Sequence, residues 1–79
     1  MTVYTSLLQY PEGDSIEIDH RLSIGQIVDL NGNPLSLPLR SSRMIVYRVS
    51  RIRRTEKTGE VTIRYDLERF TEPELNSLT

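Results

Sequence analysis

Residues 60–68, with the sequence EVTIRYDLE, alternate apolar and polar side chains without a break. Successive side chains of a β-strand point to opposite faces of a sheet, so this alternation produces one apolar and one polar face. The apolar face carries Val61, Ile63, Tyr65 and Leu67. The sequence therefore predicts a strand over residues 60–68 that covers a core on one side only.

A second strand is predicted over residues 43–54, which are rich in β-branched and aromatic side chains. The apolar face of this segment changes sides between Val49 and Ile52. A β-bulge restores the face in such a case, because it adds one residue to one strand of a pair. We therefore expect a bulge or bend near Ser50 and Arg51.

A five-residue loop over residues 55–59, which ends in Gly59, is expected to join these two strands as a hairpin. With the bulge in place, apolar side chains face one another across the hairpin, and this sets the expected register. The predicted pairs are Ile52 with Val61, Val49 with Ile63, Tyr47 with Tyr65, and Ile45 with Leu67.

The first half of the chain is also predicted to be β-structure, with a less regular pattern. Strands are expected over residues 2–10, 16–24 and 26–30. Turns separate them at residues 11–14 and 31–34, because Pro-x-Gly and Asn-Gly are turn sequences. Residues 34–39 hold two prolines and are expected to form an edge strand or an extended loop.

Near the carboxyl end, Thr71 and Glu74 have the spacing of a helix capping box. Phe70 and Leu75 occupy the positions of the hydrophobic staple that often accompanies such a box. We expect a short helical turn here, packed on the core through Leu75 and Leu78.

Five or six short strands in a chain of 79 residues indicate an all-β fold. We expect a small five- to six-stranded SH3-like barrel or a strongly bent antiparallel sheet, with a short C-terminal helical turn, because a nearly closed sheet leaves few edges. Residues 1–79 are expected to form a single small β domain. An oligonucleotide/oligosaccharide-binding barrel is the second alternative, but such barrels usually carry a helix in the middle of the chain, where this pattern has none.

Composition excludes several kinds of chemistry. The chain has no cysteine, so a disulfide framework, a thiolate zinc site and a cysteine nucleophile are ruled out. It has one histidine, His20, which rules out a multi-histidine metal site within one chain. No apolar run reaches 18 residues and the start of the chain lacks the pattern of a signal peptide, so we expect a cytoplasmic protein without membrane contact.

We expect the chain not to be an enzyme and to need no cofactor or metal. Asp19 precedes His20 directly, and neighbouring residues of a strand point to opposite faces, so these two are not expected to act as a catalytic pair. No serine or threonine lies in a strand–turn–helix elbow. The carboxylate pairs spaced two residues apart are expected to lie on a solvated face.

The least random feature of the sequence is the segregation of charge. Residues 1–30 carry five acids and one arginine, and residues 55–79 carry six acids and three cations. Residues 40–54 carry six arginines and no acid. We call residues 43–54 of this segment the Arg stripe; its candidate binding residues are Arg43, Arg48, Arg51, Arg53 and Arg54. Arginine is suited to such a role, since its planar group binds carboxylate or phosphate through two parallel hydrogen bonds.

Two interpretations of the Arg stripe remain open from the sequence. The arginines either pair internally with Glu60, Asp66 and Glu68, or they contact an anionic partner. Among partners, an acidic protein surface is favoured over nucleic acid, because the pI is about 5.7 and nucleic-acid-binding domains are usually strongly basic. If nucleic acid were bound, Tyr4 or Tyr10 would be the stacking platform.

A second candidate contact surface is the leucine-rich segment with Leu37 and Leu39. It forms either an exposed apolar patch, which would mark a contact site, or a lid that folds onto the core. Together these patterns predict a non-catalytic binding module that acts through protein–protein contacts. The alternative is a small nucleic-acid-binding barrel that uses the Arg stripe. The sequence leaves the oligomeric state open.

Overall fold

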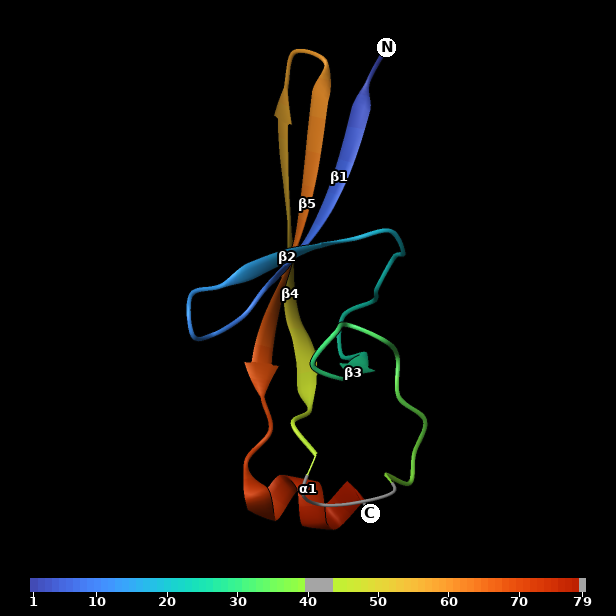
Figure 1. The fold of residues 1–79 in the computed structure, drawn as a ribbon, viewed down its shortest axis with the longest axis vertical. Helices are drawn as coiled ribbons and strands as arrows, with labels where there is room; N and C mark the ends of the chain where they lie inside the picture. Colours follow the sequence, from blue (N-terminus) through green and yellow to red (C-terminus); the bar gives the residue numbers. More distant parts are fainter. Residues whose placement is uncertain (40–43, 79) are drawn as a thin grey trace.

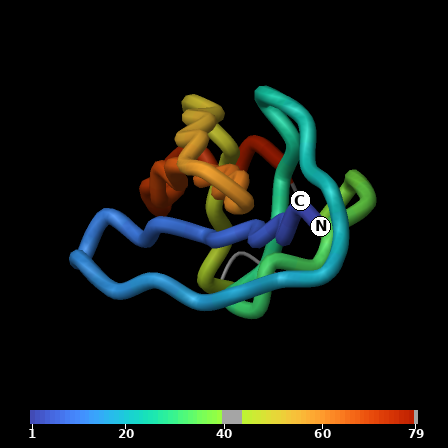
Figure 2. The backbone as a smooth tube through the Cα atoms, turned by 90° about the horizontal axis from the view of Figure 1, so that it is seen from above, coloured from blue at the N-terminus to red at the C-terminus, as the bar shows by residue number. Residues whose placement is uncertain are grey.

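The computed structural model describes residues 1–39 and 44–78, and the all-β prediction is confirmed (Figure 1). Its elements are β1 (Val3–Gln9), β2 (Ser15–Ile18), β3 (Ile27–Val28), β4 (Tyr47–Lys57), β5 (Glu60–Arg69) and α1 (Glu72–Leu78). The five strands form one strongly curled sheet, a half-barrel, seen from above in Figure 2. No helix among the described residues is long and apolar enough to cross a membrane.

The strand order in the sheet is β2-β1-β5-β4-β3. Three of the four pairings are antiparallel, as expected, but β1 runs parallel to β5, with Val3 opposite Glu60 and Gln9 opposite Asp66. A parallel pair needs a long connection, and here the whole of β2 to β4 lies between the two strands in sequence. The sheet is therefore mixed rather than purely antiparallel.

The β4–β5 hairpin contains the predicted bulge, because the register shifts between Val49 and Arg51. Its loop differs from the prediction: β4 continues to Lys57, and a two-residue turn ends in Gly59, whose φ of 79° suits glycine. The predicted register was consequently wrong. Ile52 lies opposite Tyr65 rather than Val61, Val49 opposite Leu67 rather than Ile63, and Tyr47 opposite Arg69 rather than Tyr65.

The predicted strand over residues 16–24 ends early, at Ile18. Beyond it the chain leaves the sheet, His20 Nε2 donates a hydrogen bond to the carbonyl of Gly32 (2.8 Å), and Leu22 enters the core. The turn that follows β3 is fastened by Asp29, whose carboxylate accepts hydrogen bonds from the backbone N–H groups of Asn31 and Asn33. Within residues 34–39, Pro34 forms an isolated antiparallel bridge with Val28, and the N–H of Leu35 donates to the carbonyl of Ile27 (2.9 Å). The segment thus begins at the edge of β3, as the first expected alternative has it, and continues over residues 35–39 as a loop.

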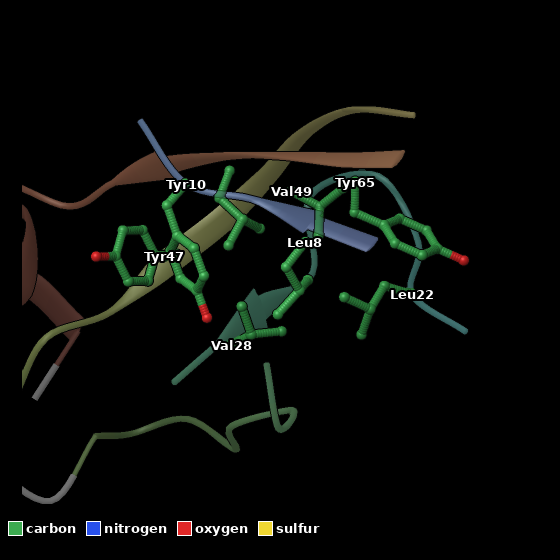
Figure 3. Close-up of a cluster of buried hydrophobic side chains, with 8 residues drawn as sticks. Leu8, Tyr10, Leu22, Val28, Tyr47, Val49 and Tyr65 are labelled. Atoms are coloured by element: carbon green, nitrogen blue, oxygen red, sulfur yellow. The ribbon is translucent and has the colours of Figure 1, made fainter. Parts of the chain in front are cut away.

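The core consists of two clusters. The larger lies inside the curl of the sheet and is shown in Figure 3. Its buried members are Leu8, Tyr10, Leu22, Val28, Tyr47, Val49, Tyr65 and Leu67. Four of these lie on β4 and β5, so the hairpin is the main wall of the core.

The smaller cluster lies beneath α1 and contains Leu39, Val46 and Leu75 as its buried members. Leu78 packs against it, and its carbonyl accepts a hydrogen bond from the N–H of Leu39 (2.8 Å). The predicted capping contact is present, since the Glu74 carboxylate accepts a hydrogen bond from the backbone N–H of Thr71 (3.0 Å). The helix therefore closes one end of the half-barrel, as predicted.

Candidate functional site

One part of the sheet extends away from the core. We call it the arm: residues 50–57 of β4, 60–64 of β5 and 3–5 of β1. In Figure 1 these three strands run side by side beyond the point where β2 crosses them. All eight residues of the β4 portion are exposed. Because neighbouring strand residues point to opposite faces, this portion of β4 is bare on both faces.

The register determines which side chains share a face of the arm. Directly opposed residues of neighbouring strands lie on the same face. One face carries Ile52, Arg54 and Glu56 on β4, above the Tyr65 and Ile63 positions of β5. We call it the inner face, because it continues the surface that lines the larger core cluster. The outer face carries Arg51, Arg53, Thr55 and Lys57 on β4, with Asp66, Arg64, Thr62 and Glu60 opposite them on β5.

Each described arginine of the Arg stripe lies near a carboxylate. Arg51 Nε donates to Asp66 Oδ2 (2.9 Å), and Arg53 Nη2 donates to Asp66 Oδ1 (2.8 Å). Arg48 Nη2 lies 3.4 Å from Glu68 Oε1, and its guanidinium also lies over the ring of Phe70. The internal pairing that the sequence suggested for Asp66 and Glu68 is therefore present.

Two features of this pairing were not predicted. Arg54 Nε donates to Glu56 Oε1 (2.7 Å), two residues along the same strand face. Glu60, expected to pair with the stripe, lies instead opposite Lys57, because the hairpin turn is shorter than predicted. Arg43, the remaining candidate, lies outside the described residues.

The outer face nevertheless keeps a surplus of positive charge. Asp66 serves two guanidinium groups, and Arg53 lies directly opposite Arg64, which donates to the side-chain oxygen of Gln9 (3.3 Å) rather than to a carboxylate. Two arginines thus share one carboxylate, and Arg64 beside them forms no ion pair with a carboxylate of the described residues. Arg51 is bound only through Nε and Arg53 only through Nη2, so both keep further N–H donors that point away from Asp66.

Asp66 is the group whose ionisation matters most for the arm. Burial opposes its charged form, but the hydrogen bonds from Arg53 and Arg51 outweigh this, so its pKa lies below the ordinary value of 3.8. Its side chain is only 16% exposed. The carboxylate is therefore charged at neutral pH.

This lowered pKa predicts an acid-dependent loss of stability. In the unfolded chain Asp66 takes up a proton at a higher pH than in the folded chain, so its contribution is complete above the unfolded pKa and is lost as pH falls through the folded pKa. Chemical denaturation between about pH 6 and pH 2 should show a falling free energy of unfolding, and Asp66→Asn should flatten this slope. The exposed Asp14→Asn variant is the control. An unchanged slope in Asp66→Asn would contradict the assignment.

The other predicted contact residues do not lie together in the structure. Leu39 is 6% exposed and belongs to the smaller core cluster. It is therefore a structural residue of the loop over residues 35–39, which we call the lid, and not a surface contact. Leu37 is 53% exposed and lies two residues before Leu39, whose N–H binds the carbonyl of Leu78 in α1. Tyr10 is buried and its hydroxyl donates to the carbonyl of Leu30, which removes it as a stacking platform. Tyr4 is 68% exposed and lies on the arm.

Two open cavities lie on the β2 side of the molecule. The first, of about 550 Å³, is lined by Glu17, Ile18, Asp19, His20, Asn31 and Asn33. The expectation that Asp19 and His20 point apart was wrong, since His20 Nδ1 lies 3.5 Å from Asp19 Oδ1 where the chain bends after β2. The other ring nitrogen is engaged by Gly32, so His20 fastens this bend to the β3 turn.

The second cavity, of about 600 Å³, contains Tyr10, Glu12 and Tyr47 among its lining residues. Burial raises the pKa of the Tyr47 hydroxyl, which therefore stays protonated and donates to Glu12 Oε1 (3.2 Å). The rings of Tyr10 and Tyr47 meet edge to face at 5.2 Å. The polar groups of this cavity satisfy one another, and they tie the loop after β1 to the hairpin.

The fold and the exposed arm define a small, strongly curled β-sheet protein with one projecting three-stranded surface. Residues 2–78 match the family described as "Uncharacterised Treponema protein", and the chain belongs to that family. No curated protein and no solved structure matches the chain.

Proposed function

We propose that this chain is a non-catalytic binding module of the small, SH3-like barrel kind, which acts through protein–protein contacts in the cytoplasm. Its contact surface is the arm. The observation that carries the proposal is the exposure of β4: residues 50–57 are exposed on both faces although they form a regular strand. A strand with neither face covered buries little apolar surface, so this portion of β4 is suited to being covered by a partner.

The composition of the arm favours a protein partner. Ile52, Tyr4 and Val3 are exposed there, which supplies apolar contacts between charged side chains. Arginine and tyrosine are the residue types that contribute most to the energy of protein interfaces. The free edge of β4 also offers backbone groups that an additional strand can bind.

Nucleic acid remains the alternative, and the positive surplus on the outer face is the observation in its favour. Two facts weigh against it. Arg54 and Arg48 are each matched by a carboxylate, which reduces the charge available to phosphates. Tyr4 is the one exposed aromatic side chain of the described residues on the arm, whereas single-strand binding surfaces usually present several.

Photo-crosslinking in cells that naturally produce the protein tests this proposal. Ile52 on the arm is replaced by benzoylphenylalanine, and in a matched variant Leu37 on the lid is replaced instead. Both side chains are exposed, so each probe is tolerated and can reach a neighbour. We expect protein adducts from position 52 that exceed those from position 37 at least about tenfold, because crosslinking requires direct contact.

The outcomes separate the candidate surfaces. Adducts from position 37 alone would move the contact site to the lid, and an absence of adducts from both positions would overturn the proposal. Adducts from position 52 that disappear after nuclease digestion would establish the nucleic-acid alternative instead.

A further inference from the structure

The sheet has two free edges with opposite properties. β2 is the last strand on one side, and it pairs only with β1. On the other side of the sheet, β3 covers the edge of β4 only at Tyr47 and Arg48. The edge of β4 over residues 51–57 therefore has no strand neighbour among the described residues. Unpaired strand edges carry rows of backbone N–H and C=O groups that can bind another strand.

Charge is unevenly distributed between these two edges on one face of the sheet. The register aligns Glu17 of β2, Leu7 of β1, Arg64 of β5 and Arg53 of β4 in one row on the outer face. The row begins with an acid at one edge and ends with arginines at the other.

The acidic edge is also uncompensated. Glu17 has no arginine or lysine of the described residues within ion-pair distance, and Asp19, which directly follows β2, contacts only His20. At the opposite edge, Arg51 and Arg53 share a single carboxylate. The β2 edge therefore carries uncompensated negative charge, and the β4 edge carries an excess of positive charge.

The inner face shows the same complementarity for apolar groups. Ile16, Leu8, Tyr65 and Ile52 form a row across the sheet. Leu8 and Tyr65 are buried in the middle, but the two ends are open: Ile16 is 38% exposed and Ile52 is 39% exposed. Another strand placed against either edge would cover these ends.

We propose that the partner of the β4 edge is a second copy of this chain, which adds its β2 edge to β4 and continues the sheet from one copy into the next. This inference rests on the proposed function, since it names the partner of the same arm. β2 and β4 run in the same direction within one copy, so a second copy that continues the sheet with its inner face on the same side places β2 parallel to β4. In this parallel alignment, Glu17 lies opposite Arg53 and Ile16 lies opposite Ile52. Opposite charges meet on the outer face and apolar side chains meet on the inner face.

Pairing of β4 with β4 of a second copy is disfavoured by charge. A two-fold antiparallel pair must place one residue opposite itself. Centring on Arg53 or Arg54 opposes two like arginines, and centring on Ile52 opposes Arg51 to Arg53. Centring on Thr55 opposes Arg53 to Lys57, and it offers Arg54 only Glu56, to which Arg54 already binds within its own strand. Like charges directly opposite one another destabilise a strand pair, so β4 selects the acidic edge instead.

Sedimentation velocity with charge-reversed variants tests this inference. The first variant, Glu17→Lys/Asp19→Lys, reverses the β2 edge. The second, Arg51→Glu/Arg53→Glu/Asp66→Lys, reverses the β4 edge and keeps an internal ion pair of opposite sign, so that the hairpin is not left with three clustered acids. Circular dichroism and thermal unfolding of each variant check that the fold is retained.

We expect the wild-type protein to associate as its concentration rises. Each variant alone should associate at least about tenfold more weakly, since the favourable cross-strand pair of Glu17 with Arg53 becomes repulsive. An equimolar mixture of the two variants should recover association. The reversed β2 edge of one variant then meets the reversed β4 edge of the other, and the unchanged β2 and β4 edges also meet, so both contacts join opposite charges. The control, Glu72→Lys/Ser77→Lys, adds positive charge at exposed positions of α1, leaves the Glu74 cap in place and should associate like the wild type.

A wild-type protein that stays monomeric at all concentrations would overturn the inference. So would association that persists in both variants, or a mixture of folded variants that fails to recover it. These results would leave the proposed function standing if the probe at position 52 still gave adducts with a different protein. Adducts from neither surface would refute the proposed function itself, so the two failures are distinguishable.

Discussion

Substituting alanine for Gly32 is expected to destabilise the protein by about 2 to 4 kcal/mol. Gly32 has a φ of 81°, a conformation that side chains rarely adopt, and a Cβ at this position would overlap Cδ1 of Leu8. Leu8 is fully buried in the larger cluster, so it cannot move aside without disturbing the core. For a domain of this size we expect a fall in Tm of roughly 10 °C or more.

Gly25 provides a matched control, because it has the same φ of 81° but nothing within 4 Å of the added Cβ. Gly25→Ala should therefore cost only the backbone strain, about 1 kcal/mol. Thermal and chemical denaturation of both variants separate the overlap from the strain. The double variant Gly32→Ala/Leu8→Ala should lose less stability than the sum of the single variants, since the shortened side chain leaves room. Equal losses in Gly32→Ala and Gly25→Ala would refute the close approach to Leu8.

The parts of the fold that the sequence predicts well are those with one buried and one wet face. The alternation from Val61 to Leu67 predicts the face of β5, because an error of one residue would place every apolar side chain in water. The bulge near Ser50 follows from the same logic, since Val49 and Ile52 must return to the same side of the sheet.

The hairpin register and the parallel pairing could not be derived in the same way. Residues 50–57 of β4 are exposed on both faces, so no burial pattern marks their partners, and the five-residue loop was inferred where β4 in fact continues to Lys57. The pairing of β1 with β5 joins segments far apart in the chain, and neither carries a local sequence signal for its partner.

The candidate site was predictable in its composition but not in its pairing. The Arg stripe is visible in the sequence, yet the partner of each arginine depends on the hairpin register. The predicted register, with Ile52 opposite Val61, places Arg53 near Glu60. In the structure both Arg51 and Arg53 bind Asp66 instead. The surplus charge of the outer face follows from this shared carboxylate and from Arg64 opposite Arg53.

The prediction with the largest effect on function concerns the arm. Replacing Arg51, Arg53 and Arg54 together with serine should abolish partner binding and leave the fold intact. The Arg54–Glu56 ion pair is exposed at both ends and contributes little to stability, about 0 to 1 kcal/mol. Asp66 is only 16% exposed and loses both of its arginine partners, so the variant is expected to be less stable than the wild type but still folded. The three arginine side chains supply the cationic contacts of the proposed interface, where arginine contributes strongly.

The measurement that tests the central claim most directly is affinity capture with this triple variant, followed by quantitative mass spectrometry of the bound proteins. The matched control is Arg21→Ser/Arg69→Glu, which changes the net charge equally but alters the body of the molecule and neither the arm nor the Arg stripe. Nuclease is included in parallel samples. The account predicts that wild type and control retain the same proteins after nuclease treatment and that the arm variant, although folded, loses them at least about tenfold. A folded arm variant that captures these proteins as well as the wild type would contradict it.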